Sequence, residues 1–208
     1  MFIEDLSPYT YVASLRSEGE KLKAVGWLAS GHPYTMRKIQ SPATHFGQLL
    51  RLMVNPWEPF YFLGYHECEF CPKENDQTAH KRNKESEETL TTRHVVNGVE
   101  IKWIRWKNPH LRADYRRHTI ERDGLVVHFG ANNLYVPGNG CVYVAPSMIA
   151  HYIDVHSYEP PTAFWEAVMN CPEMGSDAYR RSLMANGPSD EAWGRALGAE
   201  WLPPRRFP

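Results

Sequence analysis

The chain lacks the charge and hydropathy patterns that mark several protein classes. Its 23 Lys and Arg residues nearly balance 24 Asp and Glu residues, and the formal net charge is only -1. This balance gives no global signal for binding nucleic acid or a membrane surface. No window approaches 18 uninterrupted apolar residues, and residues 1–5 are acidic rather than basic and apolar. We therefore expect a soluble cytoplasmic protein with no membrane partner.

Cysteine is scarce, with four residues in a chain of 208. Cys68 and Cys71 are too close in sequence for an ordinary structural disulfide, and Cys141 and Cys171 are isolated, so a secreted disulfide scaffold is excluded. Familiar catalytic motifs are missing as well: there is no Gly-rich phosphate loop, nucleophile elbow or His-Glu-x2-His. The deaminase signature is incomplete because no proline precedes Cys68. The sequence therefore indicates no particular enzyme class.

The sequence does contain the ligand types and local spacings of a zinc site. Cys68 and Cys71 form a Cys-x2-Cys step, with His66 two residues ahead, and His151 and His156 form a His-x4-His step. Two thiolates on one tight turn and two imidazoles near a helix end are typical ligands for tetrahedral zinc. We predict one zinc site per chain, with Cys68 and Cys71 joined by two of the three histidines.

The spacing also constrains how such a site forms. Residues 72–150 separate the two pairs, far more than in a zinc finger, so the metal would tie an early strand to a late helix. Five residues of helix turn by about 500°, so the two histidine rings converge only if His156 lies at or past the helix end. His66 and Cys141 are rival ligands. Four protein ligands would make the site structural, whereas three would leave an open, catalytic position.

Two other interpretations of these cysteines stand beside the metal site. They could be buried thiols without a ligand role, with the histidines in the core or on the surface. They could also form a redox pair, but such pairs usually lie at a helix N-terminus, and here Pro72 and a charged segment follow.

Hydrophobic patterning predicts an α+β fold, with a small antiparallel sheet and hairpins, a C-terminal group of helices, and a metal site as staple. We expect one domain over residues 1–208, with 42% apolar residues sufficient for a core. A polar stretch at residues 73–92 predicts a mobile insertion. A buried strand is expected at residues 24–29 and an aromatic strand at residues 60–65. Hairpin turns are expected at residues 97–98, 123–124 and 137–140. Helices are expected from Ser41, from Pro146 to Val155, from Thr162 to Met169, from Ser176 to about Gly187, and from Pro188 onward through Leu197.

A basic region with interleaved aromatic residues, within the predicted hairpins at 93–130, is the one local signal for nucleic acid. Eight Lys or Arg residues stand against three acids between Arg93 and Arg122, with Trp103, Trp106 and Tyr115 among them. Cations suit phosphate contacts and flat rings suit base stacking. Hairpins commonly alternate this way for packing reasons, however, and we expect no strong nucleic-acid binding at physiological salt.

Several short motifs together resemble an uncharacterised family of small bacterial cytoplasmic proteins. They are residues 3–9, residues 25–28 with His32-Pro33, the His-x-Cys-x2-Cys of residues 66–71, the Ala-Pro-x-Met-Ile-x-His-Tyr-Ile of residues 145–153, and residues 156–161. They span both ends of the chain and leave out most of residues 73–130. The resemblance implies a bacterial source and a shared core, and it implies no activity.

These observations favour a non-enzymatic, zinc-stabilised protein that acts through protein-protein contacts, in an accessory or immunity-like role. The alternative is a zinc-dependent enzyme or a nucleic-acid-binding protein. Metal coordination distinguishes them, because a closed site favours the first and an open position favours the second.

Overall fold

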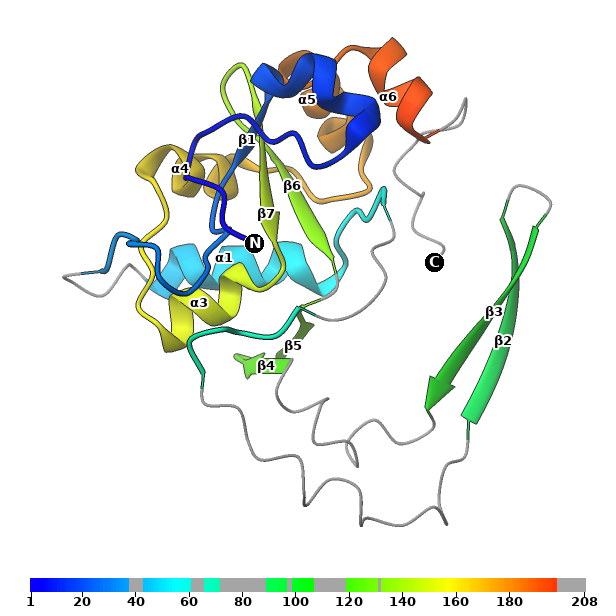
Figure 1. Cartoon of the computed structure of the whole chain (residues 1–208). Helices are drawn as coiled ribbons and strands as arrows, with labels where there is room; N and C mark the ends of the chain where they lie inside the picture. Colours follow the sequence, from blue (N-terminus) through cyan, green and yellow to red (C-terminus); the bar gives the residue numbers. More distant parts are fainter. Residues whose placement is uncertain are drawn as a thin grey trace. The chain divides into compact units, whose positions relative to one another are not determined.

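The computed structural model describes residues 1–37, 43–60, 66–71, 89–96, 99–106, 119–130 and 132–197 (Figure 1). The chain divides into two compact units. Unit 1 comprises Met1–Cys71 and Ile120–Pro208, and unit 2 comprises Pro72–Thr119. The prediction of one domain for residues 1–208 stays a prediction. Unit 1 contains all of the predicted metal ligands.

A three-stranded sheet forms the centre of unit 1 (Figure 1). Strand β1 (Leu22–Ala24) pairs in parallel with β7 (Val142–Pro146), and β7 pairs antiparallel with β6 (Asn133–Pro137). Every residue of β6 and β7 is buried, so both faces of these strands are covered. Continuous apolar strands of this kind are typical of a sheet enclosed between other elements.

Helices and a 3-10 segment enclose this sheet. The buried side of α1 (Ala43–Val54) includes Phe46, Leu49, Leu50 and Met53, as their helical spacing predicted. The side chain of Ser176 accepts a hydrogen bond from the backbone N–H of Tyr179, which confirms the predicted cap of α5 (Asp177–Asn186). The elements are η1 (Ala13–Lys21), α1 (Ala43–Val54), α3 (Ile149–Val155), α4 (Thr162–Asn170), α5 (Asp177–Asn186) and α6 (Asp190–Leu197).

Two further hairpins match their turn signals. Strand β4 (Thr119–Arg122) pairs with β5 (Leu125–His128) through Asp123 and Gly124, whose φ angles of 51° and 76° are those of a type I′ turn. In unit 2, β2 (Thr89–Val96) pairs antiparallel with β3 (Val99–Trp106). The pairing of Val96 with Val99 agrees with the predicted two-residue turn, which itself lies outside the described residues. The α+β class is therefore confirmed.

Other expectations need correction. The apolar run at residues 24–29 is not a strand, because β1 ends at Ala24 and Gly26 takes a φ of 74°. The predicted mobile insertion included Thr89–Thr92, which instead belong to β2. The rest of that insertion lies outside the described residues. So do Ser41 and most of the predicted strand at 60–65. Helix α3 starts at Ile149 because Pro146 still pairs with Asn133 in the sheet.

The turn at Gly26 is held by a carboxylate from the start of the chain. Asp5 accepts hydrogen bonds from the Gly26 backbone N–H at 2.8 Å and from the hydroxyl of the fully buried Tyr158 at 2.8 Å. Because Tyr158 follows α3, this carboxylate joins three distant segments of the sequence.

Within the described part of the chain, each helix is too short or too polar to cross a membrane.

Candidate metal centre

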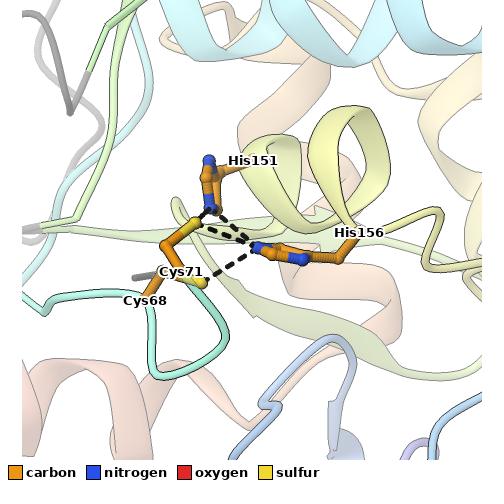
Figure 2. A group of neighbouring side chains, drawn as sticks. All are labelled: Cys68, Cys71, His151 and His156. Carbon is orange, nitrogen blue, oxygen red and sulfur yellow. Dashed lines mark hydrogen bonds between the residues drawn. The ribbon is translucent and has the colours of Figure 1, made fainter. Parts of the chain in front are cut away.

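The two cysteines lie on a short loop that is fixed at both its start and its tip. The backbone N–H of His66 donates to the carbonyl of Gly130 at 2.7 Å. At the tip, the Glu69 carboxylate accepts hydrogen bonds from the backbone N–H and the hydroxyl of Ser30, each at 2.9 Å. We call residues 66–71 the cysteine loop. Its anchors turn both sulfur atoms towards α3 (Figure 2).

The two histidines come from α3 and from its end. His151 lies inside the helix, whereas His156 is the C-terminal cap, with φ of -106° and ψ of 8°. The backbone N–H of His156 still donates to the carbonyl of Tyr152 at 3.1 Å, and the chain then leaves the helix at Ser157, whose φ is 53°. The rings therefore converge, with their Nε2 atoms 3.2 Å apart. This confirms the condition that the sequence spacing set for His156.

The four donor atoms form a compact cluster (Figure 2). Nε2 of His156 lies 3.2 Å from Sγ of Cys68 and 3.3 Å from Sγ of Cys71, and Nε2 of His151 lies 3.3 Å from Sγ of Cys71. All four donor atoms lie within 4.8 Å of one another. Zinc bonds of about 2.3 Å to sulfur and about 2.0–2.1 Å to nitrogen give tetrahedral edges of about 3.6 Å for S···N and about 3.3 Å for N···N. The cluster therefore has nearly the size of a zinc tetrahedron, and it could hold a metal ion.

Burial at the cluster favours the uncharged forms of Cys68 and His156. Burial raises the pKa of the Cys68 thiol to about 11, although the backbone N–H groups of Phe70 and Cys71 donate to its sulfur and act in the opposite direction. Burial lowers the pKa of His156, which favours the neutral imidazole that binds metals. A divalent cation with two thiolates and two neutral imidazoles carries no net charge, so binding would remove the cost of burying the thiolates.

Aromatic rings surround the donors. Phe129 stacks on His151, with ring centroids 5.5 Å apart at 23°, and Phe70 packs against His156 at 5.4 Å. Phe70 also makes edge contacts with Tyr152 and Tyr34. Such contacts fix the ring orientations of metal-binding histidines. Neither Phe129 nor Tyr34 was predicted from the sequence, because nothing in their spacing links them to the ligands.

The structure brings four of the predicted ligands together and leaves the two rival ligands out. Cys68, Cys71, His151 and His156 come together, while His66 has an exposed side chain and is not in the group. Cys141 is buried next to β7 and is also outside the ligand group. Three other polar residues make different contacts: Asp154 pairs with Arg122 at 2.8 Å, His32 stacks on Phe2, and His45 packs on Trp165. The part of the chain that the structure describes contains no further group of three or more such ligands.

Comparison with known proteins places the chain in a family. It matches the family described as a domain of unknown function (DUF7919) over residues 1–111 and 100–169, which together include every predicted metal ligand. No curated protein and no solved structure matches the chain. The match confirms the expectation of an uncharacterised family. The chain belongs to the family described as a domain of unknown function (DUF7919).

Proposed function

We propose that Cys68, Cys71, His151 and His156 bind one structural zinc ion, and that the chain is a non-enzymatic bacterial protein that acts through contacts with a protein partner. The observation that carries this proposal is the convergence of four donor atoms within 4.8 Å of one another. Two sulfur and two nitrogen donors in a tetrahedral arrangement are typical of zinc. Four protein ligands would fill the coordination sphere and leave no position for substrate or water.

The structural role follows from what the site would connect. The cysteine loop and α3 are about 80 residues apart in sequence. Among the described residues, no strand pairing joins the two segments. A zinc ion would add four strong bonds between these segments, and its binding free energy would contribute to folding. The thiolate ligands require reduced cysteines, which supports the reducing cytoplasm as the place of action.

The first test is the metal content and the stability of the purified protein. Elemental analysis should find about one zinc ion per chain, and removal of the metal with a chelator should lower the melting temperature. Re-addition of zinc should restore it, whereas magnesium should not, because magnesium prefers oxygen ligands. Protein that keeps its full thermal stability without metal would contradict a structural role.

A second test separates this proposal from the enzymatic alternative. Cobalt(II) in place of zinc gives visible absorption bands that report its coordination. In a closed site with four protein ligands, addition of azide should leave these bands unchanged. An open site would bind azide and change them, which would support a catalytic position.

A further inference from the structure

The two thiol ligands of the candidate centre lie on one short loop, so they are close to each other as well as to the histidines. Their sulfur atoms are within 4.8 Å, and both side chains are partly exposed. The other two cysteines differ in this respect, because Cys141 is 9% exposed and Cys171 is 6% exposed. A small oxidant in solution can therefore reach the loop pair more readily than the two buried thiols.

We propose that Cys68 and Cys71 form an oxidation site, at which a hydroperoxide converts the two zinc-bound thiolates to a disulfide and the zinc ion is released. This inference rests on the proposed function, since it needs zinc at the centre. It adds a regulatory property that a structural zinc site does not by itself possess.

The chemistry balances with hydrogen peroxide as the oxidant. One thiolate sulfur attacks a peroxide oxygen, the O–O bond breaks, and with one proton the products are a sulfenic acid and one water molecule. The second thiolate attacks the sulfenic sulfur, the S–O bond breaks, and with another proton a second water molecule leaves. The two sulfurs lose two electrons and the peroxide gains them. The zinc ion then retains only two imidazole ligands and dissociates.

The loop geometry makes such a disulfide reversible rather than structural. An S–S bond of about 2.05 Å requires the two sulfurs to move together from their metal-binding positions. A disulfide within a Cys-x2-Cys step closes a small ring, and strained or exposed disulfides are the ones that thiols reduce readily. A cytoplasmic thiol pool would thus restore the reduced pair and allow zinc to bind again.

Oxidation would also change the packing around the centre. The ring of Phe70, between the two cysteines, contacts both Tyr152 and His156 of the α3 segment. When the loop closes on itself, the metal no longer holds it against α3. The expected result is a chain that stays folded around the β6–β7 core but has a lower melting temperature, like the metal-free protein.

The test treats zinc-loaded full-length protein with hydrogen peroxide, with a colorimetric chelator reporting free zinc. Zinc content before treatment tests the proposed function, and zinc release after treatment tests this inference. We expect one zinc ion released per disulfide, a mass loss of two hydrogen atoms, and peptide mapping that links Cys68 to Cys71. A thiol reductant with added zinc should reverse all three changes.

Two variants serve as controls. Substitution of both buried thiols, Cys141→Ala and Cys171→Ala, should leave the rate of release unchanged. His66→Ala changes a residue of the cysteine loop that lies outside the ligand group, so it should release its zinc at the wild-type rate. Retention of zinc by the wild-type protein in excess peroxide would overturn the proposal. So would release that is accompanied by sulfinic acid alone or by a disulfide to Cys141 or Cys171.

Discussion

Loss of one cysteine ligand should weaken zinc binding by a predictable amount. Cys71 is the informative choice, because its sulfur lies 3.3 Å from Nε2 of both His151 and His156. Structural zinc sites bind with about 10–16 kcal/mol, so each of four ligands accounts for about 2.5–4 kcal/mol. At about 1.4 kcal/mol per factor of ten, Cys71→Ser should weaken the affinity by roughly 100- to 1,000-fold.

The same change should lower the melting temperature. At a fixed free zinc concentration above both dissociation constants, the free energy of unfolding falls by the binding energy that is lost. For a chain of about 200 residues, each kcal/mol corresponds to about 2–4 °C, so the expected decrease is about 5–16 °C. Serine has nearly the size of cysteine, and the side chain is partly exposed, so packing contributes little to this difference.

Chelator competition gives the affinity, and thermal unfolding in zinc-buffered solution gives the stability. The matched control is His66→Ala, which changes an exposed histidine two residues from Cys68 that is outside the ligand group. This variant should keep its zinc affinity within about threefold, and its melting temperature within about 1 °C, of the wild-type values. A Cys71→Ser protein with unchanged zinc affinity, or a His66→Ala protein with the same loss, would refute this assignment of ligands.

Three further predictions concern the fold that positions the centre. Tyr158→Phe removes the hydroxyl that donates to Asp5 and should cost about 1.5–3 kcal/mol in urea unfolding; an unchanged midpoint would show that this bond is not stabilising. Gly26→Ala should destabilise the fold by more than about 2 kcal/mol, because the added Cβ would lie 2.9 Å from two Ile149 atoms and φ is +74°. The control is Gly31→Ala, which has a φ of +81° but open space around it, and which should cost only about 1 kcal/mol. Equal losses of stability in the two variants would contradict the steric argument. Ser176→Ala removes the cap of α5 and should lower the free energy of unfolding by about 1 kcal/mol. An unchanged helical circular-dichroism signal or an unchanged melting temperature would contradict this prediction.

Local signals in the sequence predicted those parts of the site that depend on neighbouring residues. The Cys-x2-Cys spacing fixes a tight turn, and the residues after His156 indicate a helix end there. The Asp123-Gly124 turn and the Ser176 cap were predictable for the same reason. The turn depends on the positive φ that glycine adopts easily, and the cap depends on a serine side chain that bonds a backbone N–H three residues on. These features were predictable because the cause and the effect lie in one segment.

Contacts between distant segments were not predictable in this way. The parallel pairing of Leu22 with Val142 joins strands 120 positions apart, and no local pattern encodes it. The choice between His66 and His156 is similar, because the sequence allows either histidine as a ligand and does not decide between them. It is decided by the three-dimensional arrangement, in which His66 is exposed and His156 lies with the other donors. The packing of Phe129 on His151 is a further example.

X-ray absorption at the zinc edge of the purified protein tests the central claim most directly, because it reports both the metal and its ligands. The closed site predicts two sulfur atoms at about 2.3 Å and two nitrogen atoms at about 2.0–2.1 Å, with histidine ring scattering beyond them. A first shell that contains an oxygen ligand, or only one sulfur atom, would contradict the structural assignment of Cys68, Cys71, His151 and His156.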